Sequence, residues 1–191
     1  NTPGTSVYDR KGCIDSDSDG YSDPEVGWGP NNGADAFPYQ PSQWQDSDND
    51  GFGDNLDGYQ GDFCPYNSGQ SRNDRFGCLD TDADGYSNPD PVGLFGVSEW
   101  FAHPVGLADA FPSDNTQWTD TDADGYGDNW DDPAWNATHI AWGIGQWLEV
   151  ASTPDACPFI AGTSFSDRYG CPDTDSDSYS DGDENWTIDN G

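Results

Sequence analysis

Residues 46–57 read DSDNDGFGDNLD, and this stretch decides how the whole chain is interpreted. Aspartates occupy positions 1, 3 and 5, and they are followed by a glycine at position 6, an aromatic residue at 7 and an acid at 9. The pattern recurs so that the chain has five acidic loops. Their residues at positions 1, 3, 5 and 9 are Asp15, Asp17, Asp19 and Asp23; Asp46, Asp48, Asp50 and Asp54; Asp80, Asp82, Asp84 and Asn88; Asp120, Asp122, Asp124 and Asp128; and Asp173, Asp175, Asp177 and Asp181.

This spacing predicts calcium sites. Calcium takes about 6–8 oxygen ligands in a flexible shell, and carboxylates at positions 1, 3 and 5 converge when the chain curls around an ion. Glycine at position 6 permits the sharp bend. Ser178 replaces it in the fifth loop, where we expect a costlier turn. The acids expected to complete the shell at position 12 are Asp57, Asp131 and Glu184.

The first and third loops carry an acid at position 11 instead, Glu25 and Asp90. Zinc is disfavoured because the ligands are all oxygens and the two histidines are isolated in the sequence. Magnesium prefers a more rigid octahedral shell that keeps its waters, so it should bind more weakly. We expect about five to ten calcium ions, since other aspartates recur outside the loops as candidate bridging ligands: Asp9, Asp35, Asp62, Asp74, Asp109, Asp155 and Asp167.

Composition argues against an ordinary apolar core. Hydrophobic residues make up 32% of the 191 residues, and the mean hydropathy is −0.91. The formal net charge of −32 excludes nucleic acid as a partner, because phosphates require Lys and Arg. Such values alone would predict disorder. The 14% aromatic content and the fixed spacing of the acids indicate instead a fold in which ion binding and folding are one equilibrium.

Two classes of loop alternate along the chain. Cys-type loops follow a Gly-Cys pair, and Trp-type loops follow a Gln-Trp pair. The repeats predict a first unit over residues 1–73 with calcium loops 15–26 and 46–57, and a second over 74–166 with loops 80–91 and 120–131. A third unit would begin over 167–191 with loop 173–184. Insertions at 91–104 and 136–153 could hold short helices, for which the best candidates are 98–103 and 141–150.

The loops alternate with D-x-C-P turns, DFCP at residues 62–65 and DACP at 155–158. In this pattern nearly the whole chain resembles thrombospondin type 3 repeats. The resemblance implies a mostly irregular, calcium- and disulfide-stabilised repeat array, wrapped around a line of ions and with little regular secondary structure. Phe37 and Phe111 stand in the DAFP segments where the animal repeats have cysteine. The DAFP sequence is typical of microbial surface proteins with such repeats.

Four of the five cysteines form two pairs with identical spacing and matched contexts. Cys64 and Cys78 are 14 residues apart, as are Cys157 and Cys171, so we predict two disulfides and an oxidising, extracellular location. Reduced, metal-binding cysteines are the alternative. Cys13 has the context of Cys78 and Cys171, but no partner precedes it, so we expect its partner to come from outside this stretch of chain.

The pattern favours an extracellular structural protein that forms a rigid stalk or a head-to-tail filament, in contact with copies of itself. The alternative is a calcium-dependent adhesin or glycan-binding module that uses the Trp-rich insertions to hold a glycan or a protein. No catalytic constellation is recognisable around His103 or His139, and no apolar run is long enough for a membrane span. Asn136 and Asn185 lie in glycosylation sequons, and the expected location favours their use.

Overall fold

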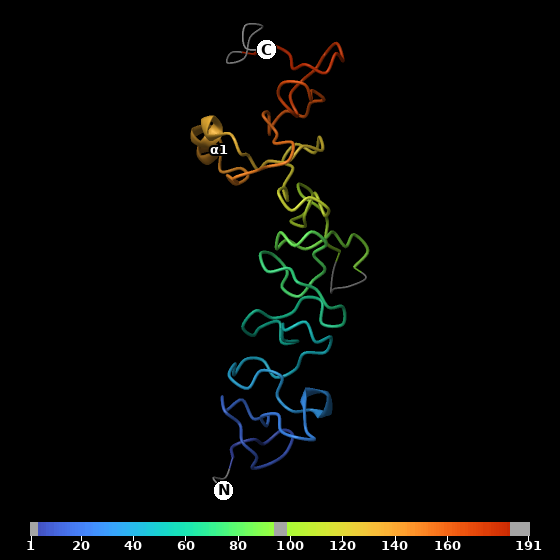
Figure 1. The fold of residues 1–191 in the computed structure, drawn as a ribbon. Coiled ribbons are helices and arrows are strands. Elements are labelled where there is room, and N and C mark those ends of the chain that lie inside the picture. The colour runs from blue at the N-terminus through green and yellow to red at the C-terminus, as the bar shows by residue number, and fades with distance from the viewer. Residues whose placement is uncertain (1–3, 94–98, 184–191) are drawn as a thin grey trace. The chain divides into compact units, whose positions relative to one another are not determined.

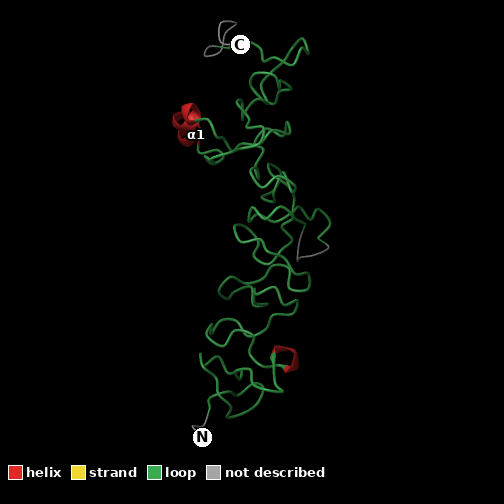
Figure 2. Cartoon of the chain, in the orientation of Figure 1, coloured by secondary structure: helices red, strands yellow, loops and turns green. Residues whose placement is uncertain are grey.

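The computed structural model describes residues 4–93 and 99–183, and in this part of the chain the structure is mostly irregular. It contains one α-helix, α1 (Asn136–Trp142), and two short 3-10 helices, η1 (Pro30–Asn32) and η2 (Pro133–Trp135). Loops and turns make up most of what Figure 2 draws, with isolated β-bridges in place of strands. The predicted fold class, an irregular repeat array with disulfides, is confirmed.

The chain divides into two compact units. The first comprises Asn1–Asp80 with Val92–Glu99, and the second comprises Thr81–Pro91 with Trp100–Gly191. The repeat boundaries expected after residues 73 and 166 follow the sequence period and remain a prediction.

The helix lies earlier than expected within the second insertion. The prediction placed it at 141–150, but α1, drawn in gold in Figure 1, ends at Trp142. Gly143 follows with a left-handed φ of 70° and donates its N–H to the His139 carbonyl, which terminates the helix. The other candidate, 98–103, begins outside the described residues, and 99–103 form bridges and turns rather than a helix.

Pairs of aromatic rings connect successive acidic loops within each unit. The aromatic residue at position 7 of a Cys-type loop stacks on the tryptophan before the next Trp-type loop: Tyr21 on Trp44 at 5.4 Å, and Tyr86 on Trp118 at 5.2 Å. Position 7 of each Trp-type loop contacts the ring before the next Gly-Cys pair: Phe52 with Phe76, and Tyr126 with Tyr169. These pairs supply local apolar contacts where no central core exists.

Polar side chains fill much of the interior. The largest fully buried side chains include Gln43, Gln117 and Asn129, together with four aspartates outside the acidic loops. A buried polar group is tolerated only when its hydrogen bonds or its charge are satisfied. The fold therefore depends on how these groups are paired.

One buried glutamine holds each Trp-type loop closed, and we call this arrangement the glutamine clasp. The Gln43 amide donates to the carbonyls of Asn55 (2.9 Å) and Tyr59 (3.1 Å), and its Oε1 accepts the Asn55 N–H (3.1 Å). Gln117 makes the same three bonds to the carbonyls of Asn129 (3.0 Å) and Ser152 (2.7 Å) and to the Asn129 N–H (2.9 Å).

The clasp explains how the second insertion is tolerated. In the first unit it joins residues 55 and 59, whereas in the second it joins residues 129 and 152. The segment between residues 129 and 152 contains η2 and α1. Both ends of this segment are bonded to Gln117, so the clasp keeps the same hydrogen bonds as in the first unit.

Removing the clasp should destabilise the first unit. We expect Gln43→Ala to cost about 2 kcal/mol of unfolding free energy, because three partly buried hydrogen bonds between this buried side chain and the backbone are lost. Gln45→Ala is the matched control, since Gln45 is exposed and donates only to the Ser47 hydroxyl. Urea unfolding in calcium measures both, and equal midpoints for the two variants would contradict this role.

Candidate metal sites

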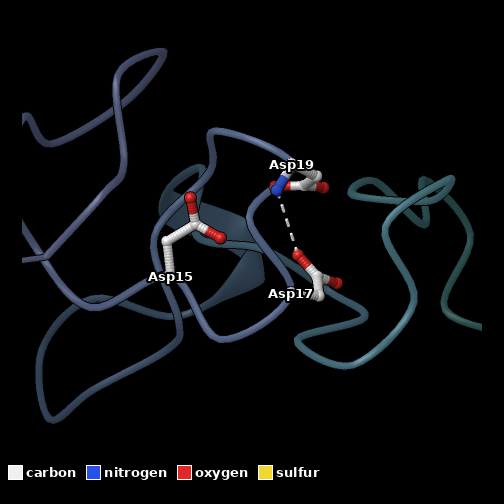
Figure 3. Close-up of side chains that lie close together, drawn as sticks. All are labelled: Asp15, Asp17 and Asp19. Carbon is white, nitrogen blue, oxygen red and sulfur yellow. Dashed lines mark hydrogen bonds between the residues drawn. The ribbon is translucent and has the colours of Figure 1, made fainter.

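Each acidic loop brings its first three aspartates together. In all five loops, one carboxylate oxygen from each of positions 1, 3 and 5 lies within 4.8 Å of the others, which makes five groups that could hold a metal ion. Figure 3 shows the first group, in which Asp15, Asp17 and Asp19 surround a single turn and the Asp19 N–H donates to Asp17 at 3.2 Å. The groups consist of hard oxygen donors only.

The position 1 carboxylate organises the turn through backbone hydrogen bonds. Asp46 accepts the N–H of Asn49 on Oδ1 (2.7 Å) and that of Gly51 on Oδ2 (3.0 Å). Asp120 accepts the equivalent bonds from Ala123 (2.7 Å) and Gly125 (3.0 Å). The first aspartate therefore shapes the loop whether or not it also binds an ion.

Two left-handed residues make the turn tight. Position 4 has a positive φ in every loop, at Ser18, Asn49, Ala83, Ala123 and Ser176. Position 6 is a glycine with φ between 93° and 103° in four loops. In the fifth, Ser178 takes a φ of 77°, a conformation that a residue with a Cβ adopts only at a cost. The expected strain at Ser178 is thus present.

Hydrogen bonds between the residue at position 9 and the residue at position 2 close the loop. The Asp54 carboxylate accepts the Ser47 N–H (2.9 Å) and the Ser47 hydroxyl (2.6 Å). Asp128 accepts the same pair of bonds from Thr121 (3.2 and 2.9 Å). Position 2 is Ser or Thr in all five loops, a regularity visible in the sequence whose role we did not predict.

In the first, second and fourth loops, some carboxylate oxygens of the metal-ligand positions are buried without a hydrogen-bond partner. Both carboxylate oxygens of Asp48 and of Asp122 are buried without a hydrogen bond, and so is one oxygen each of Asp17 and Asp19. Burial and the charges of neighbouring aspartates raise the pKa of Asp122 to about 6. Carboxylates collected in this way repel one another, and a cation between them removes the repulsion.

A second set of buried acids lies next to the loops. Asp35, Asp62 and Asp155 are each at most 1% exposed. Each accepts, on Oδ1, the N–H of the residue two positions later at 2.6–2.7 Å, and each has an Oδ2 with no hydrogen-bond partner. Burial, and then the charges of the preceding acidic loop, raise the pKa of Asp35 and Asp62 to about 7 and that of Asp155 to about 8. They are suited to be further ion ligands.

The two described acids at position 12, Asp57 and Asp131, do not join the three-carboxylate groups. Asp57 is exposed, and Asp131 accepts the Ala151 N–H at 3.3 Å. Glu184 lies outside the described residues. In the first loop, the position 11 acid Glu25 forms an ion pair with Arg10.

Disulfides join each D-x-C-P turn to the following Cys-type loop. Cys64 is bonded to Cys78, and Cys157 to Cys171. Among the described residues Cys13 is the one free cysteine, and it is partly exposed.

Of the two sequons, Asn136 begins α1 and is partly exposed, and its Oδ1 accepts the Trp130 indole N–H at 2.7 Å. Asn185 lies outside the described residues.

Comparison with known proteins gives no relative: the chain matches no protein-family model and no curated protein. Within the described residues, no helix is long and apolar enough to cross a membrane. The interpretation of the loops therefore depends on their own geometry.

A substitution at Gly77 tests whether the acidic loops and the buried acids beside them form one metal site. A Cβ at Gly77 would overlap Oδ1 of Asp62 and lie 3.2 Å from Oδ2 of Asp50, whereas one at Gly12 would meet no atom within 4 Å. The two glycines have similar φ values, 75° and 78°. We expect Gly12→Ala to cost about 1 kcal/mol through backbone strain, and Gly77→Ala to cost at least twice that and to weaken calcium binding. Urea unfolding and calorimetric titration measure the two effects, and equal losses would contradict a shared site.

The raised pKa values predict an unusual pH dependence without metal. The unfolded chain ionises these aspartates near their ordinary pKa of 3.8, and the folded chain near 7 to 8. The metal-free fold therefore loses stability as the pH rises through this interval. We expect the thermal midpoint in metal-free buffer to be lower at pH 8 than at pH 5.5, and calcium to reverse the order because it binds the ionised form. A metal-free midpoint that rises with pH would contradict this assignment.

Proposed function

We propose that this chain is an extracellular structural module whose acidic loops are held in shape by calcium. One observation carries the proposal: buried carboxylate oxygens without partners adjoin three-carboxylate groups that recur at a fixed place in each repeat. Leaving such groups ionised and unpaired in the interior is too costly for a stable fold. A divalent cation is the simplest group that satisfies several of them at once.

Calcium fits these sites better than other biological cations. The donors are carboxylate and backbone oxygens on irregular loops, which suit its variable shell of about 6–8 ligands. Asp35, Asp62 and Asp155 add a buried carboxylate beside three of the loops, which supports more than one ion per loop and a total between five and ten.

The disulfides support a location outside the cell, because they persist in oxidising compartments. The resemblance to thrombospondin type 3 repeats, with its ion-stiffened irregular chain, supports the same role. Glycosylation at Asn136 or Asn185 is compatible with that location.

A stalk or filament is the form that this module would take. The aromatic pairs and disulfides join each loop to the next along the chain, so stability is built from neighbouring contacts and the array can be extended repeat by repeat. Removal of calcium should soften each of these joints.

The surface around Cys13 supports contact with another copy or another segment. Cys78 and Cys171 are 1% and 0% exposed beneath their D-x-C-P turns, whereas Cys13 is partly exposed. Gly77 and Gly170 pack on the carboxylates Asp62 and Asp155, but Gly12 meets nothing. We propose that a D-x-C-P turn from elsewhere covers this surface and pairs with Cys13.

Electron microscopy of the purified native protein tests the assembly. With calcium we expect filaments or stiff rods, and after chelation flexible or dissociated chains. The Cys13→Ser variant should assemble less or reverse more readily under the same conditions. Compact, monodisperse particles in calcium would contradict the filament, while leaving the calcium loops to be judged by ion binding.

A further inference from the structure

A groove in the second unit is lined mainly by residues outside the three-carboxylate groups. It has a volume of about 790 Å³ and lies between the segment of η2 and α1 and the turn that follows Cys157. Its apolar lining includes Trp135, Trp142, Phe159 and Ile160. The volume falls in the range of about 300–1,000 Å³ that is usual for small-molecule sites.

The walls of the groove are aromatic and open to solvent. Trp142 is 45% exposed and Phe159 is 54% exposed, and their rings meet edge to face at 5.4 Å and 77°. The Trp135 ring lies parallel to the His139 ring at a centroid distance of 5.6 Å. Exposed rings of this kind offer flat faces on which the C–H face of a sugar ring can stack.

A buried histidine lies behind the exposed rings. His139, which also lines the groove, is 2% exposed, and its Nδ1 has no hydrogen-bond partner within the described part of the chain. The rings of three tryptophans, Trp130, Trp135 and Trp142, contact its ring and hold it in place behind the groove.

Charges around the groove disfavour an anionic ligand. Asp132, Asp167 and Asp183 lie at the groove, and the chain as a whole carries −32. Arg168 is also at the groove, where it donates to Asp183 at 2.6 Å. Neutral hydroxyls can bond to carboxylates and to the guanidinium alike.

The repeat itself does not require this groove. The glutamine clasp closes the shorter Trp-type loop of the first unit without a helix, as it does the longer one here. The insertion is instead fixed to the fourth loop by the Asn129 side chain, which accepts the Gln146 N–H, and by backbone bonds of Trp130 to Gln146 and Leu148. The insertion is thus held against the repeat by specific hydrogen bonds.

We infer that this groove binds a neutral saccharide, stacked on the exposed rings of Trp142 and Phe159. The inference goes beyond the structural role proposed above and does not rest on it, because the aromatic residues and His139 are not candidate ion ligands.

Calorimetric titration of the full chain in calcium tests the inference, with cellohexaose, maltohexaose, mannohexaose and chitohexaose as probes. We expect saturable binding of at least one probe, weakened at least tenfold in Trp142→Ala and in Phe159→Ala. Trp147→Ala is the matched control and should change affinity less than twofold, because Trp147 is an equally exposed tryptophan of the same insertion that does not line the groove. Thermal midpoints of all variants in calcium identify any loss that comes from unfolding.

Three outcomes would overturn the inference. The first is that none of the four probes binds at millimolar concentration. The second is equal weakening by Trp142→Ala and Trp147→Ala. The third is groove-dependent binding of choline or a polygalacturonate fragment without binding of any neutral probe, which would show a cationic or anionic ligand. None of these outcomes bears on ion binding, which the calcium stoichiometry of the same samples measures separately.

Discussion

Repulsion between buried carboxylates is the constraint on which the rest of this structure depends. Asp48 and Asp122 each bury two oxygens without a partner, and Asp62 and Asp155 lie beside the same loops with an unpartnered oxygen each. In an ordinary domain such groups would be moved to the surface. Here the backbone turns hold them inside, through N–H donors to positions 1, 5 and 9, so the fold collects negative charge in groups that could hold a cation.

Local contacts take the place of a hydrophobic core. Each acidic loop is joined to the next by one aromatic pair, and each Trp-type loop by a buried glutamine whose three bonds satisfy backbone groups. Because the clasp of the fourth loop closes the chain on either side of the second insertion, this insertion is accommodated without altering the clasp. The insertion carries α1, and its exposed aromatic groove is a separate feature attached to the scaffold.

The acidic loops could be predicted from the sequence because the spacing of their aspartates is itself the requirement for shared ion binding. Aspartates at positions 1, 3 and 5 can converge only in a tight turn, and the glycine or Ser178 at position 6 indicates where that turn bends. The irregular fold and the paired cysteines followed from composition and repetition. The position 12 acids were expected by analogy with a loop that leads into a helix. In the described part of the chain, η2 and α1 follow the fourth loop, yet Asp131 lies apart from its three-carboxylate group, as Asp57 does from that of the second loop.

Other features could not be read from one sequence. Gln43 and Gln117 each precede a tryptophan, and no sequence pattern marks these glutamines as buried. Their role depends on hydrogen bonds to distant backbone groups, which only the structure shows. The position of α1 was missed because the aliphatic residues that suggested 141–150 face solvent in part, and the helix is terminated by Gly143. The aromatic groove is assembled from segments on either side of Cys157, a proximity that spacing does not reveal.

The most direct test of the central claim is a calcium titration of the metal-stripped chain in which bound ions and near-ultraviolet circular dichroism are measured on the same sample. The account predicts that the aromatic signal, which reports the stacked Tyr–Trp pairs, is weak without metal and reaches its full value only as at least five ions bind per chain. A full aromatic signal before any calcium is added, or saturation below five ions, would contradict it.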